Sequence, residues 1–284
     1  MKKMFAAAAA LAALGACNQQ PESEAPTVEL YAMDCGRATF ADVGMFADDH
    51  SFDGQSRELV APCYLIRHPD GDLIWDTGFS DAVADAADGV DIPQIGAHVT
   101  MARTLAAQLA DLSLSPADIE FVSFSHAHSD HTGNGNLFTA STWIVDADER
   151  AYMFRPEARA DTQSFNFYNQ LENAETRLIE GDGDYDVFGD GAVTVIQAPG
   201  HTPGHTVLLV RLRNAGPVLL TGDMYHLAES RERRTVPTFN TDRAQTLASQ
   251  EKIERIASDT GARVIRQHVI EDFTALPAFP AALN

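Results

Sequence analysis

The feature that most constrains this chain is a cluster of histidines, with one aspartate, at the end of a short hydrophobic segment. Within six residues the chain carries His126, His128, Asp130 and His131. The preceding residues Ile119–Phe124 are mostly β-branched or aromatic and predict a strand. The Gly and Asn residues that follow predict a loop before a helix. The fold must therefore accommodate a polar, histidine-rich strand end.

The spacing within the cluster divides its side chains into two pairs. His126 and His128 are two residues apart, so an extended backbone directs both side chains to the same face. Asp130 and His131 are adjacent and cannot point the same way. One metal ion could take the first pair and a second ion the other pair. Imidazole and carboxylate ligands without cysteine suit zinc, iron, manganese or nickel in a site that is not purely structural.

The segment H-x-H-x-D-H after a hydrophobic strand resembles the signature of the metallo-β-lactamase superfamily of metallohydrolases. Three further motifs of that family follow in order, at Pro199–His205 (P-G-H-T-P-G-H), Thr221–Asp223 (T-G-D) and Gln267-His268. The resemblance implies an α/β fold, the αββα four-layer sandwich, in which helices flank two mixed sheets. We expect this hydrolase domain to span residues 28–284.

The resemblance also implies seven ligands for two divalent metal ions. The first ion would be held by His126, His128 and His201, the second by Asp130, His131 and His268, and both by a bridging Asp223. We expect zinc, with iron, manganese or cobalt as alternatives. The implied reaction is attack by a metal-bound hydroxide on an ester carbonyl, with Asp130 passing a proton to the leaving oxygen.

Two further residues are expected to support the ligands by hydrogen bonding. Asp76 ends a predicted strand in W-D-T-G, where the family carries a supporting aspartate. His205 closes the P-G-H-T-P-G-H motif and is expected to order that loop, because its prolines and glycines fix the position of His201 as the ligand.

Within the superfamily, the chain resembles N-acyl-homoserine lactonases most closely. The resemblance is carried by the stretches 63–78 (C-Y-L-I-R-H-P-D-G-D-L-I-W-D-T-G), 128–134 (H-S-D-H-T-G-N) and 261–268 (G-A-R-V-I-R-Q-H). It implies quorum quenching, in which the lactone ring of a bacterial signal is opened. The alternatives are another esterase, a β-lactamase or an organophosphate hydrolase on the same fold, a di-iron oxidoreductase, and a non-catalytic binding lipoprotein.

One position departs from the lactonase pattern. A tyrosine three residues after the bridging aspartate contacts the substrate in those enzymes. Here Asp223 is followed by Tyr225 at two residues and by His226 at three. We expect Tyr225 and His226 to be the substrate contacts.

The first 17 residues predict a lipoprotein signal peptide. Two lysines precede a short apolar stretch, and Leu14-Gly15-Ala16-Cys17 resembles the bacterial lipobox, in which Cys17 receives the lipid. Residues 18–27 would form a tether. This predicts a lipid anchor on the outer membrane or periplasmic side of a Gram-negative envelope. A soluble periplasmic or secreted protein is the alternative, and a homodimer is kept as an option for its assembly.

The bulk composition excludes one class of partner. The formal net charge of the chain is −21 and its isoelectric point is about 4.6. Nucleic-acid binding requires a basic surface, so we expect a small-molecule substrate and no nucleic acid. The two cysteines left after lipidation, Cys35 and Cys63, are expected either to form a disulfide or to remain buried thiols.

The remaining pattern predicts the elements around these motifs. We expect strands at Val28–Met33, Glu58–His68, Asp72–Asp76, Thr142–Val145, Val193–Gln197, His205–Arg211, Pro217–Leu220 and Arg263–Arg266. We expect helices at Ser80–Ala87, Val99–Leu112, Asp148–Phe154 and Thr241–Thr260. The irregular stretches 36–57 and 155–176 are candidates for the substrate walls, with Phe40, Met45 and Phe46 lining an apolar pocket.

Overall fold

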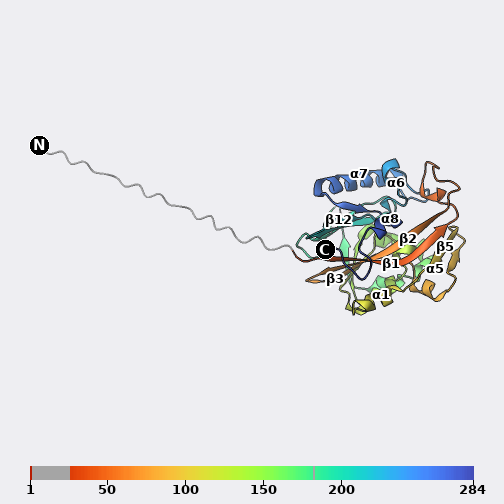
Figure 1. Cartoon of the computed structure of the whole chain (residues 1–284), viewed down its shortest axis with the longest axis horizontal. Helices are drawn as coiled ribbons and strands as arrows, with labels where there is room; N and C mark the ends of the chain where they lie inside the picture. Colours follow the sequence, from red (N-terminus) through yellow and green to blue (C-terminus); the bar gives the residue numbers. More distant parts are fainter. Residues whose placement is uncertain (2–25, 182) are drawn as a thin grey trace.

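Two β-sheets packed face to face form the centre of the protein, and helices cover the outer face of each sheet (Figure 1). The computed structural model describes residues 1, 26–181 and 183–284. The predicted lipobox Cys17 and most of the predicted tether lie outside the described residues. Over the described residues the structure confirms the predicted αββα sandwich.

The larger sheet has eight strands, and its parallel part ends close to the histidine cluster. From one edge to the other its strands are β4 (Val90–Ile92), β5 (Ala97–Thr100), β1 (Glu29–Phe40), β2 (Arg57–His68), β3 (Gly71–Trp75), β6 (Phe121–Ser123), β7 (Thr142–Asp146) and β8 (Thr176–Ile179). Strands β3, β6, β7 and β8 run parallel, whereas the others are antiparallel. The loops that follow β3 and β6 therefore leave from the same end of the sheet.

The smaller sheet has five strands and faces the larger one. Its order is β13 (Arg263–Ile265), β12 (Gly216–Leu220), β11 (Thr206–Leu212), β10 (Val193–Gln197) and β9 (Tyr185–Asp186). Only β12 and β13 pair in parallel. The two loops that follow β12 and β13 consequently leave from one end of this sheet as well.

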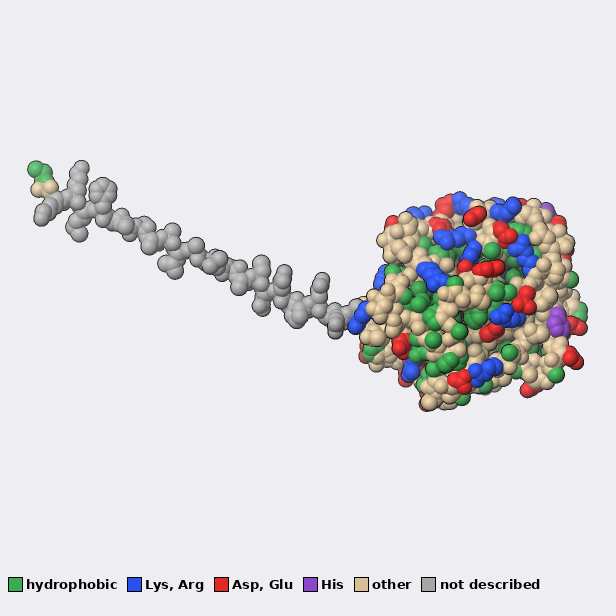
Figure 2. Space-filling model, viewed as in Figure 1, with side chains coloured by type: hydrophobic (Ala, Val, Ile, Leu, Met, Phe, Trp, Pro, Cys, Tyr) green, Lys and Arg blue, Asp and Glu red, His purple; other side chains and the backbone are tan. Residues whose placement is uncertain are grey.

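Helices form the two outer layers. The α-helices are α1 (Leu105–Asp111), α2 (Ser129–Thr132), α3 (Ala147–Met153), α4 (Pro156–Ala160), α5 (Thr162–Phe165), α6 (Ser230–Arg233), α7 (Arg243–Thr260) and α8 (Ile270–Thr274). The 3-10 helices are η1 (Gly44–Phe46), η2 (Asp81–Asp85), η3 (Pro116–Asp118), η4 (Gly135–Phe138), η5 (Asn169–Asn173) and η6 (Gly222–Met224). Figure 1 shows α7 over the smaller sheet and α1 on the opposite side of the molecule, beneath the larger sheet. Figure 2 shows acidic and basic side chains interspersed over the same view of the surface. Among the described helices, none combines the length and the hydropathy needed to cross a bilayer.

The strands are apolar on both faces because each sheet is covered on both faces. In β2, Tyr64 and Ile66 pack between the sheets, while the alternate residue Leu65 packs toward the outer helices. In β11, Leu208 joins the layer between the sheets and Leu209 joins the layer under α7. Successive side chains of a strand point to opposite faces of the sheet. Continuous hydrophobic runs therefore fill three apolar layers, one between the sheets and one between each sheet and its helices.

The first predicted strand is too short, and its extension changes the stretch 36–57. Strand β1 continues to Phe40 because it pairs with β2 on one side and with β5 on the other. A register shift between Asp34 and Arg37 in the pairing with β2 allows β1 to continue past Gly36. The irregular part of this stretch therefore begins after Phe40.

Two predicted helices are wrong in extent or type. Ser80–Ala87 is not an α-helix; the structure forms only the 3-10 helix η2 there. Val99–Leu112 is divided, because Val99 is fully buried in β5 and pairs with β1. Helix α1 begins only after Thr104, whose hydroxyl accepts a hydrogen bond from the backbone N–H of Ala107.

The predicted helix at the C-terminal side is confirmed with small changes. Helix α7 starts after Asp242, whose carboxylate accepts from the N–H of Gln245, and it ends at Gly261 in the left-handed conformation. Ile253 and Ala257 are buried against the smaller sheet, Ile256 is partly buried there, and Thr246 is buried at the start of the helix.

The open question on the cysteines is answered by the structure. Cys35 and Cys63 form a disulfide between β1 and β2, with 5.8 Å between their Cα atoms. Both residues are fully buried in the layer between the larger sheet and its helices. The bond closes a loop of sequence separation 28 and ties β1 to the strand beside it.

Leu208→Ala should destabilise the protein by about 2–5 kcal/mol, because it leaves a cavity in the fully buried layer between the sheets. The free energy of unfolding in urea measures this cost. Leu178→Ala is the matched control, since Leu178 on β8 is 45% exposed, and it should change stability by no more than about 0.5 kcal/mol. Equal effects of the two substitutions would contradict the assignment of Leu208 to the core.

Candidate metal centre

Four loops, each following a strand, meet at one end of the two sheets. The connection between the sheets is direct, because the N–H of Thr206 at the start of β11 donates to the carbonyl oxygen of Ser125 after β6, at 2.8 Å. All seven side chains that the sequence predicts as ligands lie at this end, and they comprise His126, His128, Asp130, His131, His201, Asp223 and His268. They form two groups, within each of which the potential ligand atoms lie no more than 4.8 Å apart.

The first group combines three imidazoles with one carboxylate. His128 Nδ1 lies 2.8 Å from His126 Nε2 and 3.2 Å from His201 Nε2. Asp223 Oδ2 lies 3.5 Å from His126 Nε2 and 3.3 Å from His201 Nε2. Three ring nitrogens and one oxygen therefore surround a common point, which is the donor set of a typical zinc site.

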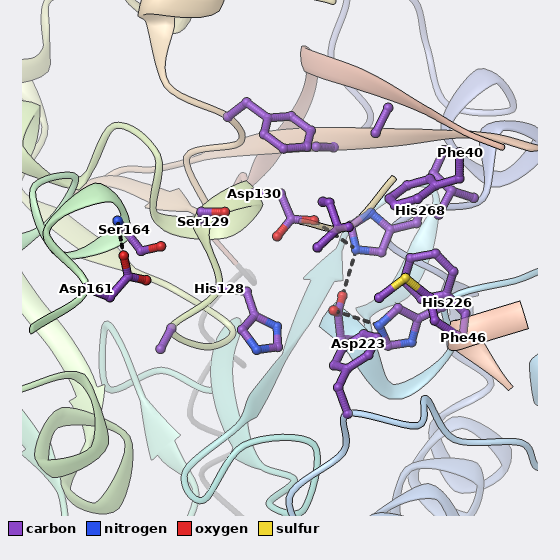
Figure 3. Close-up of a pocket in the computed structure, with 18 of the residues that line it drawn as sticks. Phe40, Phe46, His128, Ser129, Asp130, Asp161, Ser164, Asp223, His226 and His268 are labelled. Atoms are coloured by element: carbon purple, nitrogen blue, oxygen red, sulfur yellow. Dashed lines mark hydrogen bonds and ion pairs between the residues drawn. The ribbon is translucent and has the colours of Figure 1, made fainter. Parts of the chain in front are cut away.

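The second group lies on the other side of Asp223. His131 Nε2 is 3.2 Å and His268 Nε2 is 2.8 Å from Asp223 Oδ1. Asp130 completes the group, with its oxygens 3.8 Å from His131 Nε2 and 3.7 Å from His268 Nε2. Figure 3 shows Asp130 and His268 on the same side of Asp223. Asp223 thus presents one carboxylate oxygen to each group, as expected of a bridging ligand.

The hydrogen bonds behind the second group indicate that a cation belongs there. His131 Nδ1 faces Asp76 Oδ2 at 3.0 Å, and His268 Nδ1 faces the carbonyl oxygen of Val60 at 2.8 Å. Each ring donates its proton at that nitrogen, which leaves a lone pair on Nε2. His131 Nε2 and Asp223 Oδ1 are both buried without a hydrogen-bond partner among the described residues. These two atoms both accept hydrogen bonds and lie 3.2 Å apart, so they repel each other unless a positive charge lies between them. A metal ion would supply that charge, and the residues therefore fit a metal site.

The electrostatics of the two groups differ. Burial lowers the pKa of His128 to about 3 and that of His126 well below its ordinary value, so both rings are neutral at pH 7 and their lone pairs can bind a metal. Burial also disfavours the charged form of His131, but the carboxylates of Asp223 and Asp76 outweigh burial and raise its pKa well above the ordinary value. The second group therefore attracts either a proton or a metal ion.

Asp76 connects the ends of three strands, as expected of a supporting residue. Its carboxylate accepts from the N–H of Ser125 at 2.6 Å, from the Ser125 hydroxyl at 3.0 Å and from the Gln267 amide at 3.1 Å, and it also faces His131. It is fully buried, with φ at +55° in the left-handed region. Such a conformation in a residue other than glycine persists only where surrounding contacts impose it.

His205 contacts the backbone on both sides of the site, next to its own loop at Ala198 and in the turn that carries Asp223. Its Nε2 accepts a hydrogen bond from the N–H of Asp223 at 3.0 Å, while its Nδ1 faces the carbonyl oxygen of Ala198 at 3.2 Å. Gly222, which directly precedes Asp223, has φ at +48°, and a Cβ at this position would lie 2.7 Å from His205 Nε2. Only glycine therefore allows the T-G-D turn to approach His205 this closely.

Tyr225 does not reach the cavity, contrary to the expectation that it contacts the substrate. It is 1% exposed under α7, and its hydroxyl donates to Glu254 Oε1 at 2.8 Å. The physical reason is the extended backbone at Tyr225, which turns consecutive side chains to opposite sides. His226 consequently faces the cavity, with its Nε2 2.9 Å from Asp223 Oδ2 and its ring stacked on Phe46.

A cavity of about 400 Å³ opens directly above the two groups. One wall is apolar and comes from β1, β2 and the segments after β1 and β3, with Phe40, Met45, Phe46, Leu59 and Phe79. The opposite wall is more polar and comes from residues 152–168, with Tyr152, Arg155, Asp161, Ser164 and Tyr168. Figure 3 shows these walls on opposite sides of His128 and Asp130. The predicted apolar lining by Phe40, Met45 and Phe46 is confirmed, and part of the stretch 155–176 does line the cavity.

Several residues of the site escaped the sequence reasoning. Phe239, in the loop before α7, places its ring 5.8–5.9 Å from those of His128, His201 and His226. Ser125 contacts ring nitrogens of both His126 and His131 through its hydroxyl. Glu149 binds the backbone of two ligand loops. Ser125 directly precedes the histidine cluster and could have been found, whereas Phe239 and Glu149 belong to no recognisable motif.

The chain is similar to known lactonases over most of its length. The family described as the metallo-beta-lactamase superfamily matches residues 57–268. The N-acyl homoserine lactonase AttM of Azorhizobium caulinodans is 34% identical over 239 residues, which are 81% of this chain and 88% of that protein. An N-acyl homoserine lactonase of Bacillus cereus is 27% identical over 236 residues, which are 80% of this chain and 88% of that protein.

Comparison with solved structures finds similarity to the same group of proteins. A solved N-acyl homoserine lactone hydrolase, with the product N-hexanoyl-L-homoserine at its catalytic metal centre, superposes with a TM-score of 0.75 and 25% identity. The match covers 91% of this chain and 100% of that one. The matched family extends over every strand end that carries one of the seven predicted ligands. The chain therefore belongs to the metallo-β-lactamase superfamily.

Proposed function

We propose that the protein hydrolyses the lactone ring of N-acyl-homoserine lactones. The observation that carries this proposal is the position of Asp223, whose two carboxylate oxygens face separate histidine groups at the base of a half-apolar cavity. The similarity to AttM, which is named an N-acyl homoserine lactonase, supports the substrate class. Two divalent cations, which we propose to be zinc, would polarise the ester carbonyl and lower the pKa of the attacking water.

The side chains around the base of the cavity suit ring opening. Water oxygen bonds to the carbonyl carbon, the ring C–O bond breaks, and the leaving oxygen takes up a proton. Asp130 is well placed to move this proton, because its side chain is 28% exposed to the cavity. Burial raises its pKa, but His131 and His268 outweigh burial and lower it, so Asp130 is a carboxylate that can accept the proton from water.

The two walls of the cavity suit the two parts of such a substrate. An acyl chain loses contact with water along the apolar wall of Phe40, Met45 and Phe46, which stabilises the bound state by about 0.8 kcal/mol for each buried CH₂. His226 lies between this wall and Asp223, so we propose that it contacts the lactone ring or its amide.

His128→Ala should remove most of the bound metal and lower kcat/KM for lactone hydrolysis by more than about 100-fold, because His128 Nδ1 faces both other imidazoles of the first group. Elemental analysis of the purified full chain and a panel of homoserine lactones measure the two effects. His98→Ala is the control, since its side chain is 43% exposed and, within the described part of the chain, its ion-pair partner is Asp91 on β4, away from the two groups. Full activity of His128→Ala with depleted metal would refute the proposed mechanism.

Phe46→Ala should weaken the preference for long acyl chains. The substitution removes a ring from the apolar wall, so kcat/KM for a ten-carbon acyl chain should fall about 10-fold more than for a four-carbon chain. The short-chain substrate is the internal control for damage to the metal centre, because Phe46 also stacks on His226. An equal loss for both substrates would assign Phe46 to support of the centre alone.

We further propose that Cys17 carries a lipid that anchors the enzyme to the envelope. The support is the L-G-A-C sequence after a short apolar stretch. Cys17→Ser should move the protein from the membrane fraction to the soluble fraction of the cells, as followed by immunoblotting. If the unaltered protein is already soluble, the lipid anchor is refuted and a periplasmic or secreted protein is favoured.

A further inference from the structure

Glu149 is a buried carboxylate that the proposed reaction does not use. It lies in the first turn of α3, directly after β7, and is only 2% exposed. Asp146 caps this helix separately, since its carboxylate accepts from the N–H groups of Asp148 and Glu149. The Glu149 side chain is therefore not needed to start the helix.

The carboxylate of Glu149 instead joins two loops that carry metal ligands. Its Oε1 accepts a hydrogen bond from the N–H of Ala127 at 2.7 Å, and its Oε2 accepts from the N–H of Gly204 at 2.9 Å. Ala127 lies between His126 and His128, and Gly204 lies in the loop of His201. One side chain thus ties the loop after β6 in the larger sheet to the loop after β10 in the smaller sheet.

The packing at Gly204 shows that this contact is close. A Cβ at Gly204 would lie 2.3 Å from the backbone nitrogen of Glu149 and 2.4 Å from Asp146 Oδ1. The loop of His201 therefore lies directly on the start of α3, at a distance that only glycine permits. Movement of α3 or loss of the carboxylate would be transmitted to this loop.

We propose that Glu149 is a positioning residue, which sets the spacing between the His126–His128 pair and His201 and thereby the metal affinity of the first group. This inference rests on the proposed metal centre. His128 Nδ1 lies 2.8 Å from His126 Nε2 in the same loop and 3.2 Å from His201 Nε2 in the other loop. Small displacements of either loop therefore change the geometry offered to a metal. A ligand set that is held in place before binding loses less entropy when the metal arrives.

Glutamine tests the role of the charge without changing the shape. A carboxylate offers two acceptor oxygens, whereas an amide offers one acceptor and one donor. In Glu149→Gln one of the two N–H groups must therefore face an NH₂ group, and a buried N–H without an acceptor is costly. Burial raises the pKa of Glu149 to about 7, so measurements at pH 8 keep the native carboxylate ionised.

The experiment measures the affinity of the metal-free full chain for Zn²⁺ alone, by competition with a chromophoric chelator at pH 8. In Glu149→Gln, one of the two zinc affinities should be about 10- to 100-fold weaker than in the unaltered chain, while the other stays the same. Excess zinc should restore kcat for lactone hydrolysis in this variant, because no group that touches the substrate has changed. Gly204→Ala tests the same contact from the loop side and should lower zinc affinity in the same direction.

Thr104→Ala is the control for a general loss of stability, because it removes only the N-terminal cap of α1. It should lower the melting temperature and leave zinc affinity unchanged. The positioning role is refuted if Glu149→Gln binds zinc as tightly as the unaltered chain, or if Thr104→Ala weakens zinc binding equally. Failure of the unaltered chain to bind zinc would instead refute the proposed metal centre, so the two failures are distinguishable.

Discussion

The structure depends on one buried carboxylate. Asp223 is 3% exposed, and an ionised carboxylate in such a position is unstable unless opposite charge and hydrogen-bond donors surround it. Burial raises the pKa of Asp223, but the facing imidazoles of His226, His268 and His131 outweigh burial and lower it well below the ordinary value. These histidines come from the loops after β6, β12 and β13, so the sheets must face each other in one register for the carboxylate to be stabilised. The site is thus also a constraint on the fold.

The site is held in place by hydrogen bonds to groups that are not themselves predicted ligands. Asp76 fixes His131, the carbonyl oxygen of Val60 fixes His268, and His205 fixes the backbone of Asp223. Each of these contacts joins segments from different strands, and the bonds of Glu149 to two loops are of the same kind. Metal ligands in proteins keep their orientation through such partners. The precision of this centre therefore comes from hydrogen bonds between strand ends rather than from the rigidity of any single loop.

The sequence predicts the residues whose role is marked by local spacing. The ligands and Asp76 stand at strand ends within short motifs, and the structure brings them together, while the apolar runs with a period of two predict most of the strands. The errors have tertiary causes. Val99 enters β5 because it pairs with the edge of β1. Tyr225 points away from the cavity because the backbone there is extended, which places its side chain opposite that of His226. Glu149 could not be found, because its partners are backbone N–H groups, which any residue except proline can provide.

Different segments of the chain form the base of the cavity, which carries the predicted ligands, and the apolar wall, which would select the substrate. The side chains at the base come from motif residues, whereas the apolar wall comes from β1, β2 and the segments that follow β1 and β3, where no metal ligand is encoded. Phe46 and Phe239 contact each other and the imidazoles of His226, so the wall continues without a break to the base of the cavity. Substitutions in the wall can therefore change which acyl chain is bound while the geometry of the seven ligands stays the same.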